Sequence, residues 1–334
     1  MDFFTHIIVS VALANQIRQD EDSSRAFLLG GLTPDFDVFF TWLPALIPQL
    51  FILQHRGLFH TVFIAPFMVM AVILSTKHFE KTIFIKRLQV PFHGLHTKLS
   101  FKTVVWGMLG FCLHLFMDII TQGGLPLFYP LVDQRITSST ISVFDPVITI
   151  LSSILVLRFL YRKITDPEKY SSIQFKRVAT SISILFIFLL GIYGSFEVVT
   201  IVIHSPTSTS PDIIPIFRWT IKEKDKAISI SYVNQLSQTP VKTYNYTSLT
   251  YNQSDWDFSA IESVIEEAKR TLDYQKFKFQ LGSDTRIAWN VTFNEIEHLW
   301  EISCLDTLRD AQNRFYGLTA SFIEAEVIIH LNQN

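Results

Sequence analysis

The segment His55-Arg56-Gly57-Leu58-Phe59-His60 opens a long apolar stretch, and the fold of the chain depends on how this segment is placed. Two imidazoles and a guanidinium are unusual at a membrane entrance, because polar groups at membrane depth are costly and generally line cavities or hold ions. The alternative is a pair of interfacial histidines beside an arginine whose side chain extends to the membrane surface. Two neutral imidazoles at one helix mouth would supply half of a metal site.

A second ionisable pair lies inside the next apolar segment. His114 and Asp118 are four residues apart, so both side chains would lie on one face of a helix. A hydrogen-bonded pair that stabilises helix packing is the alternative interpretation. An unpaired charge in hydrocarbon costs roughly 2.5–3.5 kcal/mol on insertion scales, and a metal ion would compensate that cost better than a single imidazole.

A third ionisable pair, in which both members are acidic, follows Pro34 and consists of Asp35 and Asp37. In a turn the two carboxylates would point apart, so one could bind a metal ion while the other orients an imidazole. Solvated caps of a turn are the alternative, and His6 could equally be a packed histidine. We expect the side chains to converge on one or two divalent ions such as Zn²⁺, with six ligands: His6, Asp35, His55, His60, His114 and Asp118.

The composition is typical of a multi-span membrane protein that carries a soluble portion. Hydrophobic residues make up 49% of the chain and charged residues 17%, and the mean hydropathy is +0.29. The net charge of -2 creates no basic field, so no nucleic-acid partner is expected. Two cysteines, Cys112 and Cys304, argue against a disulfide framework.

The hydropathy pattern predicts an all-α polytopic bundle in the cell membrane. Residues 3–17 are apolar but too short to cross, and the prolines of residues 26–54 favour a re-entrant hairpin after a polar loop at 18–25. Four later segments are long enough to cross a bilayer: 58–76, 103–122, 143–161 and 178–203.

Basic residues are concentrated in two of the connecting loops, 77–102 and 162–177. The positive-inside rule makes both loops cytoplasmic, so the His and Asp residues would meet at the outer boundary and the chain beyond residue 203 would be extracytoplasmic.

The residue composition changes after Ser205. We therefore expect a membrane domain, 1–204, followed by a small extracytoplasmic α+β domain, 205–334. Residues 205–212 indicate a linker, and residues 257–272 an amphipathic helix. Alternating polarity predicts six strands: 214–222, 226–234, 274–281, 285–292, 297–303 and 315–330.

The order of the motifs resembles the YdjM-like family of predicted membrane-bound metal-dependent hydrolases. The resemblance covers roughly residues 1–165 and departs at Thr61, where family members commonly carry serine; threonine keeps the hydroxyl. Five short motifs carry it: Met1-Asp2-Phe3-Phe4-Thr5-His6, Leu32-Thr33-Pro34-Asp35-Phe36-Asp37, His55 to Thr61, Gly110 to Asp118, and Gly123 to Pro130. The family is distantly similar to the superfamily of zinc-dependent phospholipase C and single-strand nucleases, which implies phosphodiester hydrolysis.

This resemblance implies an integral membrane hydrolase of phosphoesters. A metal-bound water with a pKa of about 7 would attack the ester, Arg56 would hold a phosphate oxygen, and Asp37 would orient a ligand or act as general base. A site at the outer leaflet favours a lipid headgroup or a lipid-linked phosphate as substrate. Two alternatives remain open: a non-enzymatic membrane protein that binds metal structurally or in transport, and an anchored surface-binding protein. The sequence does not indicate the oligomeric state.

Overall fold

The computed structural model describes residues 2–16, 20–81, 97–132, 134–142, 145–165, 172–204, 208–212, 216–251, 258–281, 287–294, 299–316 and 325–332. The chain divides into two compact units, and each is described by itself. Unit 1 comprises Met1–Ser195 with Ile213–Pro215 and is helical; unit 2 comprises Phe196–Asp212 with Ile216–Asn334 and contains the β-sheets.

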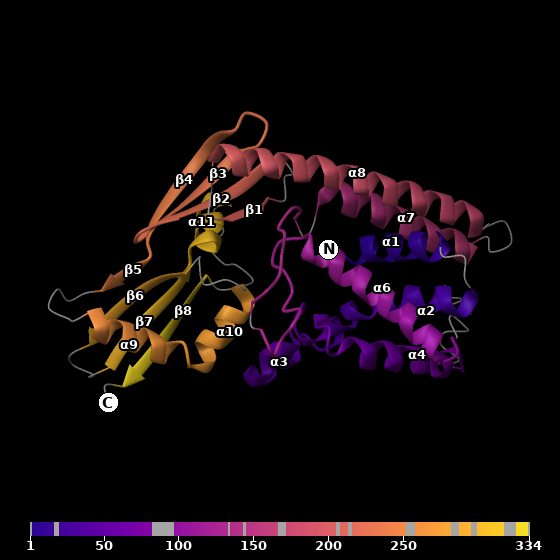
Figure 1. Ribbon diagram of the computed structural model, residues 1–334, viewed down its shortest axis with the longest axis horizontal. Coiled ribbons are helices and arrows are strands. Elements are labelled where there is room, and N and C mark those ends of the chain that lie inside the picture. The colour runs from indigo at the N-terminus through magenta and orange to yellow at the C-terminus, as the bar shows by residue number, and fades with distance from the viewer. Residues whose placement is uncertain are drawn as a thin grey trace. The chain divides into compact units, whose positions relative to one another are not determined.

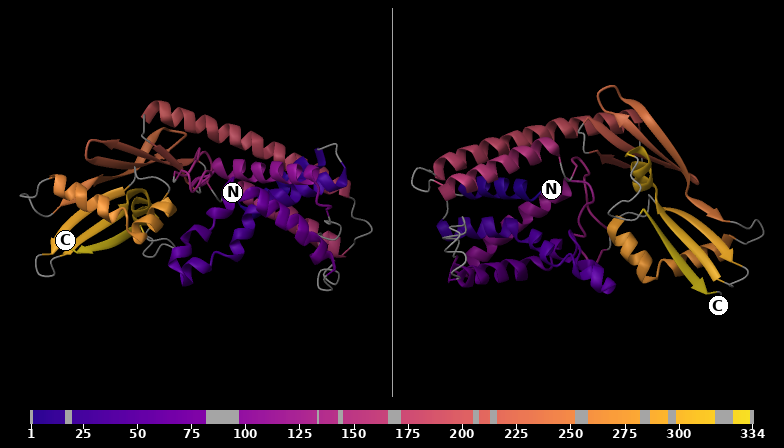
Figure 2. Two further views of the ribbon diagram at one scale, coloured as in Figure 1. Left: turned by 60° about the horizontal axis from the view of Figure 1, so that its bottom comes forward. Right: turned by 180° about the vertical axis from the view of Figure 1, so that it is seen from behind.

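Six longer helices and four short ones build the described part of the N-terminal half (Figure 1). The longer helices are α1 (Phe3–Gln16), α2 (Glu21–Leu32), α4 (Ala65–Lys81), α6 (Phe101–Ile119), α7 (Pro146–Thr165) and α8 (Ser172–His204). The short ones are η1 (Pro34–Phe39), α3 (Leu43–Leu46), η2 (Pro48–Leu53) and η3 (Leu58–His60). Helices α7 and α8 run side by side (Figure 2), where Ile148 packs in one cluster with Phe186.

Helix α2 replaces most of the polar loop expected at residues 18–25, and that expectation is wrong from Glu21 onward. Asp20 caps the helix by accepting a hydrogen bond from the Ser23 backbone N–H at 2.8 Å, and Glu21 and Asp22 occupy the first turn. Acidic residues stabilise a helix N-terminus, so a charged first turn can look like a loop in a hydropathy pattern.

Glycines allow α2 and α6 to cross in direct backbone contact. A Cβ atom added at Gly30 would lie 1.9 Å from the carbonyl oxygen of Gly107, and one at Gly110 would lie 2.0 Å from that of Phe27. Only hydrogen fits at these positions. The crossing therefore fixes the position of α2 against the polar end of α6.

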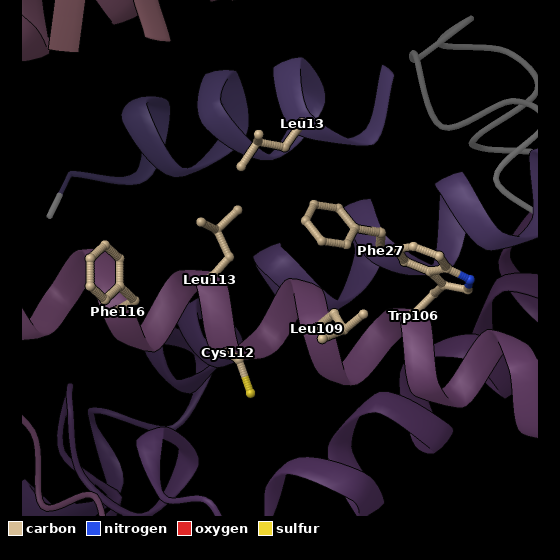
Figure 3. Close-up of a pocket in the computed structure, with 7 residues that line it drawn as sticks. All are labelled: Leu13, Phe27, Trp106, Leu109, Cys112, Leu113 and Phe116. Carbon is tan, nitrogen blue, oxygen red and sulfur yellow. The ribbon is translucent and has the colours of Figure 1, made fainter. Parts of the chain in front are cut away.

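An apolar groove of about 550 Å³ lies beside this crossing (Figure 3). Figure 3 shows Leu13 of α1 directed toward Leu113 of α6, with Phe27 and Trp106 side by side. The lining is uncharged throughout: Leu13, Phe27, Trp106, Leu109, Cys112, Leu113 and Phe116. With no ionisable side chain other than the Cys112 thiol, the groove is not the centre of polar chemistry.

Two helices in the described part of the chain are long and apolar enough to cross a membrane, namely α6 and residues Ser183–His204 of α8. Segments Pro48–His60 and Ala65–Thr76 qualify only as a pair bent by 83°. The span expected at 58–76 thus includes a bend, because the long helix α4 starts only at Ala65, where Pro66 is tolerated in the first turn. The span expected at 143–161 corresponds to α7, whose apolar part among the described residues is Pro146–Arg158.

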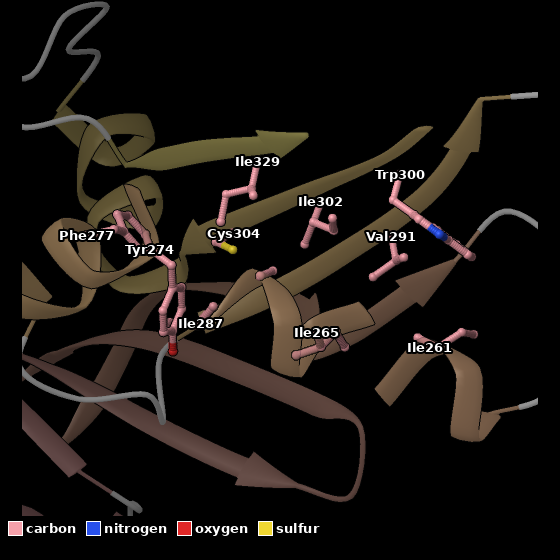
Figure 4. Packing of buried hydrophobic residues seen from close by; sticks show 11 residues of the cluster. Ile261, Ile265, Tyr274, Phe277, Ile287, Val291, Trp300, Ile302, Cys304 and Ile329 are labelled. Atoms are coloured by element: carbon pink, nitrogen blue, oxygen red, sulfur yellow. The ribbon is translucent and has the colours of Figure 1, made fainter. Parts of the chain in front are cut away.

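The described part of unit 2 contains two four-stranded sheets. The first is antiparallel: β1 (Ser208–Pro211), β2 (Phe217–Lys224), β3 (Ala227–Asn234) and β4 (Thr239–Thr247). The second joins β5 (Leu249–Tyr251) in parallel to β6 (Ile287–Asn294), followed by antiparallel β7 (Leu299–Asp306) and β8 (Glu326–Asn332). The helices are α9 (Phe258–Ala268), α10 (Leu272–Leu281) and α11 (Thr307–Tyr316). Figure 4 shows Ile261 and Ile265 of α9 beside Val291 and Ile302 of the second sheet.

Strands β2, β3, β6 and β7 confirm four of the expected strands. The strand expected at 274–281 is wrong, because this segment is α10: Tyr274 and Phe277, three residues apart, are buried on one helix face, and Thr271 Oγ1 accepts from the Tyr274 N–H. Three further boundaries differ. Residues 208–211 of the expected linker form β1, and the expected helix at 257–272 ends at Ala268. Of the expected strand at 315–330, the first two residues end α11 and the last five belong to β8, while 317–324 lie outside the described residues.

Candidate metal centre

Four separate segments of unit 1 bring histidines and aspartates together. Helix α1 contributes His6, η1 contributes Asp35 and Asp37, the chain through η3 contributes His55 and His60, and α6 contributes His114 and Asp118. All except His55 are buried, and the His55 side chain is 49% exposed. The cluster therefore has one member in contact with solvent and six that are enclosed.

The inner part of the cluster is formed by His6, His114 and Asp118. His6 Nε2 lies 3.4 Å from Asp118 Oδ1, and His114 Nε2 lies 3.4 Å from Asp118 Oδ2. The two imidazole rings stack with centroids 3.7 Å apart. One potential ligand atom from each residue lies within 4.8 Å of the others, which is a separation that one metal ion could bridge.

Asp35, His55 and His60 form a second group with ligand atoms within 4.8 Å of one another. The two groups are contiguous, because His60 Nε2 lies 3.4 Å from Asp118 Oδ2 and His114 Nε2 lies 3.5 Å from Asp35 Oδ1. The structure thus brings all six expected ligands into one region with two adjacent groups.

The backbone of α2 orients His114. The carbonyl oxygen of Gly31 lies 2.8 Å from His114 Nδ1, so this nitrogen carries the proton and donates it to the carbonyl. The lone pair of Nε2 then faces the carboxylates, as in metal-binding histidines whose second nitrogen donates to the backbone. Gly31 reaches this position because of the close α2–α6 crossing, which sequence analysis did not foresee.

Asp37 contacts the Nδ1 atoms of two histidines of the cluster. His55 Nδ1 lies 3.0 Å from Asp37 Oδ1, His60 Nδ1 lies 3.2 Å from Oδ2, and the Arg56 backbone N–H donates to Oδ2 at 2.9 Å. Burial opposes ionisation of Asp37, but its contacts with His55 and His60 lower the pKa of this carboxyl group below its usual value. A carboxylate in this position orients the imidazoles, and His60 Nε2 then lies 3.4 Å from Asp118 Oδ2.

Arg56 is enclosed by protein contacts. Its Nη2 donates to Asp118 Oδ1 at 2.6 Å, and Nη1 donates to the carbonyl oxygen of Gln122 at 3.0 Å. Its φ of 60° is left-handed, and at the neighbouring Gly57 a Cβ atom would lie 2.1 Å from the Ile52 carbonyl oxygen. This tight turn holds the guanidinium beside Asp118.

Arg135 is a second cation here that the sequence analysis did not single out. Its Nη2 donates to the carbonyl oxygen of Arg56 and its Nε to that of Gly123. The Gly123-Gly124 pair lay inside a quoted motif, but nothing in the sequence linked it to residue 135.

Several buried ring nitrogens in the cluster have no hydrogen-bond partner among the described residues, and His6 Nε2, His60 Nε2 and His114 Nε2 are among them. Asp35 Oδ2 is also buried without a hydrogen-bond partner among the described residues. Leaving such atoms unpaired is costly, and a divalent cation would satisfy them. Imidazole nitrogens with carboxylate oxygens are a donor set that fits Zn²⁺ and similar ions.

Comparison with known proteins supports the membrane assignment. A family model described as YdjM inner membrane protein matches residues 1–202. No curated protein and no solved structure matches the chain. The matched region covers more than half of the chain and contains every residue of the cluster, so the chain belongs to the YdjM inner membrane protein family.

Proposed function

We propose that this membrane protein is a metal-dependent hydrolase of phosphoesters. The cluster would hold one or two divalent ions such as Zn²⁺ through His6, Asp35, His55, His60, His114 and Asp118. The observation that carries the proposal is the set of buried imidazole nitrogens that face carboxylates without a hydrogen-bond partner among the described residues. A bound ion of this kind polarises a phosphoryl oxygen and lowers the pKa of water to about 7.

The surrounding residues would prepare the site. Asp37 orients His55 and His60, and Gly31 orients His114. Arg56 neutralises Asp118 through Nη2, and its buried Nε, which has no partner among the described residues, is the atom that we assign to a phosphate oxygen. General-base action by Asp37 is the less favoured role, because its oxygens already contact three groups.

The placement in the membrane is part of the proposal. Positive charge in the loops 77–102 and 162–177 supports a multi-pass domain, 1–204, with these loops in the cytoplasm. The cluster would then lie at the outer boundary, and the domain 205–334 would be extracytoplasmic.

Purified protein in detergent tests the proposal. Bound metal is measured by mass spectrometry, and hydrolysis is measured with bis-p-nitrophenyl phosphate as substrate. Both measurements are made on the wild type and on the variants His60→Ala and Asp118→Ala. Asp145→Ala is the matched control, because Asp145 is a buried carboxylate that caps α7 by accepting from the Ile148 N–H. We expect metal and activity to be lost in the two cluster variants and kept in the control.

Two other outcomes would favour the alternatives. Metal that is bound by the wild type and lost in both cluster variants, without hydrolysis by any form, favours a structural or transport role. Unchanged metal content in both variants would contradict the metal site and leave an anchored binding protein.

A further inference from the structure

An uncharged, exposed segment connects two residues of the cluster. Residues 38–54, which we call the apolar hairpin, contain no charged side chain. The structure describes all of them, and none is buried. Its exposed large hydrophobic side chains are Val38, Phe39, Phe40, Trp42, Leu46 and Ile47. A contiguous exposed apolar surface of this kind marks contact with a membrane or a partner.

Both ends of the apolar hairpin meet at the metal centre. Asp37 precedes it and His55 follows it, and their side chains are 3.0 Å apart. The Arg56 N–H closes the same neck by donating to Asp37 at 2.9 Å. Whatever surrounds the hairpin therefore lies directly next to the cluster.

Two observations favour lipid as the surroundings of the apolar hairpin. Its second limb belongs to the bent pair Pro48–His60 and Ala65–Thr76, which together have the length and composition of a membrane span. Polar side-chain groups in its first limb are bonded within the hairpin, since Trp42 Nε1 donates to the Phe39 carbonyl and Thr41 Oγ1 to that of Val38. Internal satisfaction of polar groups is what a lipid environment requires.

We infer that the apolar hairpin inserts among acyl chains, and that the phosphoester cleaved at its neck belongs to a membrane phospholipid. The substrate assignment rests on the proposed hydrolase function. The hairpin would hold the cluster at the depth of the headgroups, where a phosphate can reach the ligands while its acyl chains stay in the bilayer. In the reaction the oxygen of water bonds to phosphorus, the ester P–O bond breaks, and the alcohol leaves with a proton from that water.

Insertion is tested by the fluorescence of Trp42. The full chain is reconstituted in phosphatidylcholine vesicles with brominated acyl chains, and the wild type is compared with Trp42→Phe. Trp219→Phe is the control, because Trp219 is fully buried in unit 2. We expect the part of the tryptophan fluorescence that bromine quenches to be smaller in Trp42→Phe than in the wild type. In Trp219→Phe this quenched part should stay unchanged. An unquenched Trp42 would overturn insertion and favour a protein partner on the hairpin.

The substrate is tested with two probes: vesicles of phosphatidylethanolamine and phosphatidylglycerol, and soluble bis-p-nitrophenyl phosphate. Phe39→Ser and Leu46→Ser change only the hairpin, and Val241→Ser changes an exposed apolar residue of β4. We expect each hairpin variant to lose about tenfold in hydrolysis of the vesicle lipid, as the loss of one buried apolar side chain implies, and to keep hydrolysis of the soluble probe. Val241→Ser should match the wild type with both.

The two probes separate the possible failures. Wild-type hydrolysis of the soluble probe but not of the lipids would overturn the phospholipid assignment and leave the proposed hydrolase intact. Equal losses with both probes in the hairpin variants would show a structural role and also overturn the assignment. Hydrolysis of neither probe would reject the hydrolase together with its substrate, while Trp42 quenching would still decide insertion.

Discussion

At the scale of single residues, Asp37 is the clearest case of a side chain that acts through others. The substitution Asp37→Asn keeps the size of the side chain but removes its charge and one acceptor, so His55 and His60 would lose their orienting partner. We expect metal affinity to fall about 10–100-fold, as for other residues that orient metal ligands. The measurement is a metal titration in detergent, with Asp22→Asn as control, because Asp22 is a half-exposed carboxylate in the first turn of α2. An unchanged affinity would show that Asp37 is dispensable for the imidazoles.

The acid sensitivity of metal binding should come from the imidazoles. The pKa of Asp37 lies below its usual value, so its charge is present above about pH 4 and is lost only as the pH falls through that lowered pKa. Histidine ligands must be neutral, so protons compete with the metal ion and binding should weaken as the pH falls. A titration repeated between pH 8 and 5 measures this, and affinity that is constant over the whole range would contradict histidine ligation.

Sequence analysis could identify the side chains that gather here because imidazoles and carboxylates stand out in apolar segments. His114 and Asp118 illustrate this, since their i, i+4 spacing alone places them together. Their metal binding stays a prediction. The Gly31 carbonyl could not be foreseen, because a backbone partner depends on how two helices cross and every residue carries a carbonyl. The link from Arg135 to Arg56 was hidden for the same reason.

At the scale of elements, the α2–α6 crossing should control the metal centre. Gly110→Ala would place a Cβ atom 2.0 Å from the Phe27 carbonyl oxygen and force the helices apart, which also separates Gly31 from His114. Overpacking of this kind costs about 1–3 kcal/mol, so both the thermal stability in detergent and the metal content should fall. Gly191→Ala is a matched control, because a Cβ atom at this position of α8 would meet no atom of the described residues within 4 Å. Equal effects of the two substitutions would reject the role of the crossing.

Helices and strands were predicted well where the hydrophobic pattern has one clear period, and poorly where helical and strand patterns compete. The alternation in β3 and the long apolar run of α8 led to correct assignments. Residues 277–281 alternate as regularly as a strand, yet α10 buries Tyr274 and Phe277, three residues apart, on a helical face. Tertiary packing therefore decided between two periods. The bend before Ala65 was missed because hydropathy measures composition and contains no information about the backbone direction at residues 61–64.

At the scale of the whole molecule, a bound ion should stabilise unit 1 and leave unit 2 unchanged, because all the clustered residues belong to unit 1. A ligand present at 100 times its dissociation constant stabilises the folded state by about 2.7 kcal/mol. Hydrogen exchange of the full chain with and without Zn²⁺ measures where this stabilisation appears. We expect slower exchange in α1, η1, η3 and α6 and no change in β2, β3, β6 and β7. Protection spread equally over both units would show that the ion couples them, and protection confined to unit 2 would mean that the ion binds elsewhere.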